Sequence, residues 1–117
     1  MEYLFVYGTL LNEGSNKIAD FLHKNSNFQG NGYFHGKVFN LGEYPGAILS
    51  ENPDDRVYGK VFRLNDPAGI FSILDDYEGA AEISLPHNEF IRQRIAVWME
   101  SGEVKECWVY LYNHTKP

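Results

Sequence analysis

The segment from Asp66 to Gly79 carries the signals of a complete helix, in a chain whose other patterns are mostly those of strands. Asp66 is a good N-cap residue, Pro67 suits the first helical position, and Gly79 is a typical C-terminal stop. Apolar residues recur at the spacing i, i+3, i+4, i+7, which predicts one buried face formed by Ile70, Ile73, Leu74 and Tyr77. One strong helix among strands favours an α+β fold.

Strand patterns lie on both sides of this helix. Short apolar or alternating runs predict strands at 3–7, 33–41, 47–49, 56–64, 90–100 and 104–113, and a second, shorter helix is predicted near 15–25. Ser101-Gly102-Glu103 predicts a three-residue hairpin loop between the last two strands. We therefore expect one domain, residues 1–117, built as a curled mixed sheet or a small barrel.

Two of the predicted strands carry the same short pattern. His35–Leu41 and Tyr58–Leu64 agree at five of seven positions, including a glycine in second place. Seven residues are too few to indicate a repeat architecture. We expect the two segments to occupy similar places in one sheet, with each glycine where two backbones approach closely.

Charge and cysteine content exclude several classes of function. The formal net charge is −6, from 16 acidic and 10 basic residues, and no basic stripe is present, so nucleic-acid binding is not expected. The single cysteine, Cys107, cannot form an intramolecular disulfide, which favours a reducing compartment. There is neither a signal-peptide pattern nor an apolar run of roughly 20 residues, so we expect a cytoplasmic protein without a membrane segment.

Metal and cofactor patterns are also missing from the sequence. The four histidines are scattered, no Cys/His pair has metal-ligand spacing, and no glycine-rich nucleotide-binding loop occurs. We therefore expect no metal site and no cofactor. Cys107 as a nucleophile would need a base beside it, and a buried strand cysteine is the more common situation.

The first feature that could carry chemistry is Tyr7-Gly8-Thr9-Leu10, at the end of the opening strand. A glycine followed by a small hydroxyl residue lets the backbone turn sharply and present successive N–H groups. Such a turn can hold a carboxylate or an oxyanion without a charged side chain. An ordinary strand-ending turn would use the same residues.

The second feature is Glu78, in the last turn of the predicted helix, with Asp75 three residues before it. The negative end of the helix dipole and a neighbouring carboxylate both disfavour an ionised Glu78 and are expected to raise its pKa. A glutamate with a raised pKa suits general acid–base chemistry. The alternative is an exposed acidic helix end that has no function.

These motifs follow one another in an order that resembles a known family. A strand ends in Tyr7-Gly8-Thr9-Leu10, a Tyr-Pro-Gly turn follows, and the pattern Leu-Asp-x-Tyr-Glu-Gly closes the helix at Gly79. The next strand carries Arg92 between aromatic and aliphatic positions. From Tyr3 to about Tyr112 the chain resembles the γ-glutamylcyclotransferase-like family, which includes γ-glutamylamine cyclotransferases and avirulence-induced plant proteins.

The resemblance implies a small mixed β-barrel with two flanking helices and a pocket at one end. It implies cyclisation of a γ-glutamyl amide to 5-oxoproline, with release of an amine. Glu78 falls on the family's catalytic glutamate, and the register of the motif favours it over nearby Glu82. Tyr7, Gly8, Thr9 and Leu10 fall on the segment whose backbone N–H groups bind the γ-glutamyl unit, and the bordering turn is Tyr44, Pro45 and Gly46.

The implied partner is a small γ-glutamyl substrate, a γ-glutamyl amine or a γ-glutamyl-lysine isopeptide. The segments 25–32 and 80–88 are expected to be loops that contact the leaving group. Neither the leaving group nor the oligomeric state follows from the sequence. Two alternatives from other classes are a non-catalytic module that binds a small carboxylate in the same pocket, and an interaction domain that uses an aromatic surface.

Overall fold

A computed structural model describes residues 1–7, 17–40, 45–78, 80–81 and 90–113. The elements in chain order are β1 (Tyr3–Val6), α1 (Lys17–Lys24), β2 (Ser26–Asn40), β3 (Pro45–Leu49), β4 (Arg56–Leu64), α2 (Pro67–Glu78), β5 (Ala80–Ala81), β6 (Phe90–Met99) and β7 (Val104–Tyr112).

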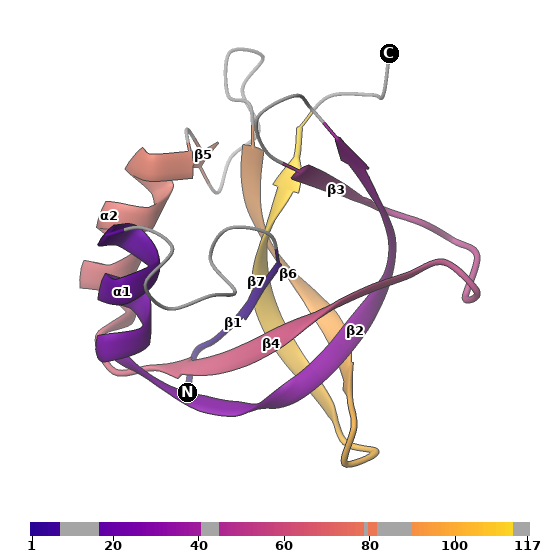
Figure 1. Cartoon of the computed structure of the whole chain (residues 1–117), viewed down its shortest axis with the longest axis horizontal. Coiled ribbons are helices and arrows are strands. Elements are labelled where there is room, and N and C mark those ends of the chain that lie inside the picture. Colours follow the sequence, from indigo (N-terminus) through magenta and orange to yellow (C-terminus); the bar gives the residue numbers. More distant parts are fainter. Residues whose placement is uncertain (8–16, 41–44, 79, 82–89, 114–117) are drawn as a thin grey trace.

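The strands form a closed, mixed barrel. Neighbours follow the order β3-β2-β4-β1-β7-β6-β5, and an additional pairing of β2 with β6 closes the ring (Figure 1). The pairings β1–β7 and β5–β6 are parallel, whereas β1–β4, β2–β3, β2–β4, β2–β6 and β6–β7 are antiparallel. The helices α1 and α2 lie together on one side of the barrel (Figure 1). The expected small mixed β-barrel with two flanking helices is confirmed.

Two apolar layers hold these elements together. One fills the barrel and contains Phe5, Phe34, Ala47, Val57, Val61, Ile95, Val97, Met99, Cys107, Val109 and Leu111. The other lies between the barrel and the helices and contains Leu4, Val6, Ala19, Leu22, Phe62, Leu64, Ile70, Phe71, Leu74, Phe90 and Tyr110. Strand β7 contributes to both layers, because its side chains alternate between its two faces. Strand β7 is therefore covered on both sides.

The repeated sequence pattern forms neighbouring strands. His35–Leu41 lies mostly in β2 and Tyr58–Leu64 in β4, and these strands pair antiparallel. A Cβ on Gly36 would run into the carbonyl oxygen of Ile48, and one on Gly59 into the carbonyl oxygen of Val6. Each glycine therefore stands where two backbones approach closely, as predicted.

The expected loop at 25–32 is wrong, because Ser26–Gly32 lies in β2. The α1 helix leads directly into this strand: Ser26 donates its hydroxyl to the carbonyl of Leu22 at 2.6 Å, which satisfies a carbonyl at the helix end. Pairing with β4 begins at Ser26 and shifts register between Phe28 and Gly30. Polar and glycine residues give this segment little strand propensity of its own, so its partner β4 decides its structure.

Helix α2 begins as predicted, but its buried face is rotated. The Asp66 carboxylate accepts the Gly69 N–H at 3.3 Å, which confirms Asp66 as the N-cap. Phe71 is buried beside Ile70 and Leu74, whereas Ile73 is 43% exposed. The expectation for Ile73 is therefore wrong, because the barrel covers a face centred nearer to Phe71. The predicted stop, Gly79, lies outside the described residues.

The last hairpin turns at the predicted place, but its loop begins one residue earlier than predicted, because β6 ends at Met99 and Glu100 belongs to the turn. Gly102 has φ of +92°, and Met99 and Glu103 close the turn with a hydrogen bond of 2.8 Å. In the described part of the chain, no helix has the length and apolar character needed to cross a bilayer.

Candidate active site

Tyr7 joins three strands at one end of the barrel. It follows β1, and its ring packs against the apolar interior. Its hydroxyl donates to the carbonyl of Tyr110 in β7 at 2.6 Å and accepts the N–H of Ala47 in β3 at 3.0 Å. Figure 1 shows the start of β3 and the end of β7 at this end of the barrel. The end of β1 is thereby fixed against both strands.

The second predicted motif begins β3. Pro45 and Gly46 were expected in a turn, but they are the first residues of this strand and pair with Asn40 and Phe39 of β2. Ala47, the next residue, makes the hydrogen bond to Tyr7. The structure therefore brings the start of β3, with Pro45 and Gly46, next to the end of β1, which the sequence order alone did not require.

Asp75, near the end of α2, is held by two residues of the barrel. Its carboxylate accepts bonds from Arg92 Nε at 2.9 Å and Nη2 at 3.2 Å, and from the Tyr110 hydroxyl at 2.7 Å. Arg92 and Tyr110 are opposite one another in the β6–β7 pairing. A two-pronged arginine–carboxylate contact fixes direction as well as distance. The C-terminal part of α2 is therefore set in a defined position on β6 and β7.

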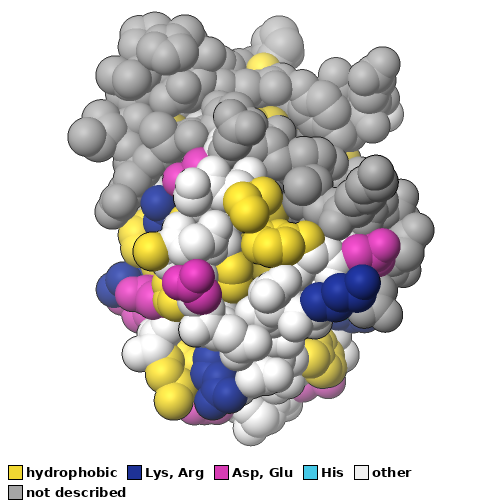
Figure 2. Space-filling model, turned by 90° about the vertical axis from the view of Figure 1, so that its left-hand side faces the viewer, with side chains coloured by type: hydrophobic (Ala, Val, Ile, Leu, Met, Phe, Trp, Pro, Cys, Tyr) yellow, Lys and Arg dark blue, Asp and Glu magenta, His cyan; other side chains and the backbone are white. Residues whose placement is uncertain are grey.

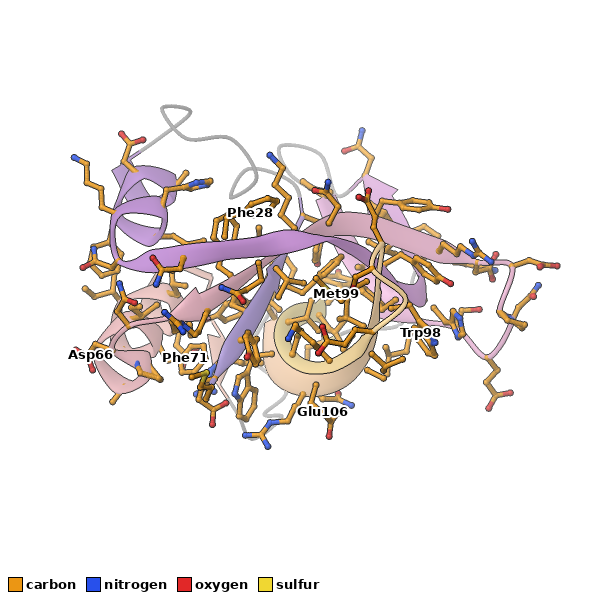
Figure 3. All side chains as sticks on the ribbon, turned by 90° about the horizontal axis from the view of Figure 1, so that it is seen from below. Phe28, Asp66, Phe71, Trp98, Met99 and Glu106 are labelled. Carbon is orange, nitrogen blue, oxygen red and sulfur yellow. The ribbon has the colours of Figure 1, made fainter. Side chains whose placement is uncertain are left out.

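The guanidinium of Arg92 is also enclosed by aromatic rings. Its Cζ lies 3.9 Å from the ring centre of Phe71 and 4.6 Å from that of Trp108. The Arg92 side chain is only 11% exposed and that of Asp75 is 23% exposed. Phe71 is labelled on α2 in Figure 3, on the side of the helix that faces the strands. Weak solvent screening strengthens the ion pair and the cation–π contacts.

Asp75 changes the electrostatic argument about Glu78. From the sequence, Asp75 was expected to act on Glu78 as an unpaired negative charge. The structure gives Asp75 a cationic partner, Arg92, at 2.9 Å. That partner offsets much of the repulsion that the sequence argument assumed, because Asp75 does not face the helix end as an unpaired charge.

The predicted site residues differ in how far the structure describes them. Glu78 is the last residue of α2, and nothing is described of its side chain. Tyr7, Pro45 and Gly46 lie together through the Tyr7–Ala47 contact. The remaining predicted residues lie outside the described residues: Gly8, Thr9, Leu10, Tyr44 and the alternative acid Glu82.

The sequence did not predict that Tyr110 contacts two of the elements in this region. Its side chain contacts Asp75 of α2, and its backbone carbonyl contacts Tyr7. The sequence showed only that Tyr110 alternates with buried residues in a strand. Its two partners are 35 and 103 residues away along the chain, so no local pattern could have identified them.

Cys107 lies in the barrel interior and takes part in none of these hydrogen bonds. It is fully buried, and this burial raises the pKa of its thiol to about 12. A thiol with such a pKa is protonated at neutral pH and is a poor nucleophile. Among the described residues, no group of three or more His, Cys, Asp or Glu side chains is arranged to hold a metal ion.

A separate cavity of about 460 Å³ lies elsewhere on the barrel. It is lined by Asn31, Gly32, Tyr33, Tyr58, Gly59, Lys60, Trp98, Met99 and Glu100. Of these residues, only Asn31 and Gly32 lie in a segment, 25–32, that the sequence predicted to contact the leaving group. Its ring faces already have partners within the chain. Arg56 lies 4.5 Å from the ring centre of Tyr33, and the His35 ring stacks on Trp98 at 4.2 Å. These contacts leave the first cluster, around Tyr7 and Tyr110, as the stronger candidate.

The described surface on the helix side shows no continuous basic area. Figure 2 shows basic, acidic and apolar side chains interspersed there. This distribution agrees with the net charge of −6. It offers no electrostatic footprint for a nucleic acid on that part of the surface.

Comparisons with known proteins give the family. The sequence profile described as "Gamma-glutamyl cyclotransferase, AIG2-like" matches residues 4–117. No curated protein sequence matches the chain. Several solved structures do, all at low sequence identity.

A crystal structure of an AIG2-like protein from Mus musculus is 24% identical, with a TM-score of 0.73, over 100% of this chain and 80% of that one. A solution structure from Arabidopsis thaliana is 24% identical, with a TM-score of 0.72, over 99% and 72%. A structure called "Gamma-glutamyl cyclotransferase" is 18% identical, with a TM-score of 0.69, over 98% and 68%. These likenesses establish the fold, and together with the profile they show that this chain belongs to the gamma-glutamyl cyclotransferase, AIG2-like family.

Proposed function

We propose that this chain is a γ-glutamylcyclotransferase that converts a γ-glutamyl amide to 5-oxoproline and releases an amine. The observation that carries the proposal is the contact chain from Tyr7 through Tyr110 to Asp75. It links the end of β1, where the γ-glutamyl unit would bind, to the helical turn that ends at Glu78. Membership of the family supports the same reaction.

The reaction needs one base and good positioning. The α-amino nitrogen of the substrate attacks its own γ-carbonyl carbon, and a new C–N bond closes the five-membered ring. Glu78 takes a proton from the attacking nitrogen and returns it to the leaving nitrogen as the old amide bond breaks. No water is consumed. Holding the chain in a ring-forming shape can supply much of the acceleration, because intramolecular attack has a high effective concentration.

Backbone groups would bind the common part of the substrate. In this proposal the N–H groups of Gly8, Thr9 and Leu10 hold the γ-glutamyl unit, and Tyr44, Pro45 and Gly46 border the pocket. Backbone donors suit this task because they are fixed in place before the substrate arrives. The hydrogen bonds of Tyr7 support the proposal by restraining the residue that leads into this segment.

The proposed substrate is a small γ-glutamyl amine or a γ-glutamyl-lysine isopeptide. Because a γ-glutamyl unit carries both an ammonium and a carboxylate group, the acidic surface of the protein does not exclude it. The proposal includes a single cytoplasmic domain that works without a metal or cofactor, since one base and fixed donors are sufficient for the chemistry.

The test is the release of 5-oxoproline, followed by mass spectrometry. The panel contains γ-glutamyl-lysine, simple γ-glutamyl dipeptides, a γ-glutamyl amine and glutathione. We expect 5-oxoproline from at least one member of the panel. The member that reacts fastest identifies the leaving group that the enzyme prefers. Glu106, an exposed acid on β7, offers a matched control: Glu106→Gln should retain activity, whereas Glu78→Gln should lose it.

Glu82→Gln separates the two candidate acids. We expect this variant to stay active. Loss of product in Glu82→Gln with retention in Glu78→Gln would transfer the role of the base to Glu82. A folded wild-type protein that binds panel members but releases no 5-oxoproline would contradict the enzyme proposal and support a carboxylate-binding module.

A further inference from the structure

Asp75, Arg92 and Tyr110, which we call the Asp75 cluster, join α2 to the barrel next to the candidate site. Asp75 accepts three hydrogen bonds, two from Arg92 and one from Tyr110. All three side chains are partly or largely buried. The arrangement leaves the carboxylate little freedom to turn, because its donors come from two different strands.

The position of this cluster relates it to the proposed base. Residues three apart in a helix are neighbours on its surface, so Asp75 lies beside the position of Glu78 in the last turn of α2. A shift of Asp75 would therefore shift the backbone that carries Glu78. The cluster restrains the helix where the proposed chemistry needs it.

The same cluster also reaches the substrate-binding side. The carbonyl of Tyr110 accepts the Tyr7 hydroxyl at 2.6 Å, while the Tyr110 hydroxyl donates to Asp75 at 2.7 Å. One residue thus contacts both the end of β1 and the end of α2. These are the two segments whose separation would decide how far the base lies from the bound γ-glutamyl unit.

A neighbouring ion pair shows what an ordinary surface contact looks like here. Arg94 lies two residues further along β6, with its Cζ 4.8 Å from the ring centre of Trp108, and it pairs with Glu2 at 3.1 Å. Its side chain is 46% exposed and that of Glu2 is 36% exposed, against 11% and 23% for Arg92 and Asp75. In the described part of the chain, neither Arg94 nor Glu2 forms a hydrogen bond or ion pair with α2, so this pair provides a matched control for the Asp75 cluster.

We infer that Asp75, Arg92 and Tyr110 are positioning residues that set the distance between the last turn of α2, which ends at Glu78, and the end of β1 at Tyr7. This inference rests on the proposed function for its catalytic part. The cluster does not touch the reacting atoms. It acts by fixing the backbone of the helix turn, and a misplacement of about 1 Å can lower a catalytic rate roughly 100-fold.

The clearest variant is Tyr110→Phe, with Asp75→Asn as the second. Tyr110→Phe removes the bond to Asp75 but keeps the buried ring and the carbonyl that holds Tyr7. We therefore expect kcat to fall about 10- to 100-fold while KM changes less than about threefold. Arg94→Gln should leave both values near wild type. The double variant Tyr110→Phe with Asp75→Asn should lose less than the product of the two single losses, because both remove the same contact.

A second measurement does not depend on activity. Amide hydrogen exchange should quicken in the last turn of α2 in Tyr110→Phe and Asp75→Asn, and stay unchanged there in Arg94→Gln. A merely stabilising role would instead raise exchange throughout the molecule and leave kcat of the folded fraction unchanged.

The outcomes separate this inference from the proposed function. If the wild type makes no 5-oxoproline, the proposed function fails, and local exchange still decides whether the cluster fixes the helix end. If the wild type is active and Tyr110→Phe and Asp75→Asn keep full kcat, the inference is overturned. An equal loss of kcat in Arg94→Gln would also overturn it.

Discussion

The N–H of Ala47 donates to the Tyr7 hydroxyl at 3.0 Å, across 40 residues of sequence. This bond places the start of β3, with Pro45 and Gly46, against the end of β1. The same hydroxyl donates to Tyr110 in β7, so Tyr7 uses both its donor and its acceptor capacity. The end of β1 and the start of β3 are therefore held together by a specific contact.

Removal of the Tyr7 hydroxyl should weaken both stability and substrate binding. Tyr7→Phe keeps the ring but leaves the Ala47 N–H and the Tyr110 carbonyl without this partner, at a cost of about 1–3 kcal/mol in the free energy of unfolding. We expect KM to rise more than kcat falls, because the segment proposed to bind the γ-glutamyl unit follows Tyr7 and loses this restraint. Urea denaturation and steady-state kinetics measure the two effects.

The control for Tyr7→Phe is Tyr3→Phe. The Tyr3 hydroxyl makes an exposed contact of 3.7 Å with the Met1 sulfur, so its loss should change stability by less than about 0.5 kcal/mol. Equal effects of the two substitutions would show that the hydrogen bonds of the Tyr7 hydroxyl do not contribute to stability or to substrate binding.

The two ion pairs of β6 should differ in their contribution to stability. Arg92→Gln leaves Asp75 partly buried without its cation and uncovers Phe71, so we expect a loss of about 2–4 kcal/mol. Arg94→Gln breaks a more exposed pair and should cost less than about 1 kcal/mol. The midpoints of denaturant unfolding, compared at equal m-values, give the change in the free energy of unfolding for each variant. Comparable losses would contradict the burial argument.

The two adjacent residues Ile73 and Leu74 test the observed face of α2. Leu74 is fully buried, so Leu74→Ala should destabilise the protein by about 2–5 kcal/mol. Ile73 is 43% exposed, so Ile73→Ala should cost less than about 1 kcal/mol. Thermal or urea unfolding distinguishes these results. A larger loss of unfolding free energy in Ile73→Ala than in Leu74→Ala would contradict the observed buried face of α2 and favour the face predicted from the sequence.

Cys107 should make the protein sensitive to alkali. Its pKa is raised to about 12 in the folded protein, against about 8.5 in an unfolded chain. A thiol pKa that is higher in the folded protein than in the unfolded chain stabilises the folded state. This contribution is fully present at a pH below the unfolded-state pKa, and it is lost as the pH rises through the folded-state pKa. The free energy of unfolding of the wild type should therefore fall faster than that of Cys107→Ala between about pH 8.5 and pH 12.

Thiol labelling at neutral pH checks the same residue independently. We expect slow reaction in the native protein and rapid reaction in denaturant, since the thiol is buried and protonated. Rapid labelling of the folded protein, or parallel pH curves for the wild type and Cys107→Ala, would contradict the assignment.

Much of the fold followed from local patterns. The N-cap Asp66, the hairpin at Gly102 and the alternation along β7 are set by neighbours close in sequence, so they could be predicted. The strand at Ser26–Gly32 could not, because its polar and glycine residues form a strand only through pairing with β4. The buried face of α2 also depends on where the barrel lies, which a helical pattern does not contain.

The candidate site divides in the same way. The motifs around Tyr7 and Gly46 could be recognised in the sequence, and the structure brings both together through Ala47. The contacts among Asp75, Arg92 and Tyr110 depend on the register of β6 and β7 and on how α2 packs against these strands. No spacing of residues in the sequence could therefore have predicted them. The role of Glu78 stays a prediction.

The most direct test of the central claim compares wild type and Glu78→Gln on the preferred panel substrate, with binding measured by calorimetry and 5-oxoproline by mass spectrometry. Replacing a carboxylate by an amide removes the base but keeps its shape. We predict that 5-oxoproline release falls at least about 100-fold in Glu78→Gln, while the substrate binds within a few-fold of wild type. Undiminished 5-oxoproline release by Glu78→Gln would contradict the account.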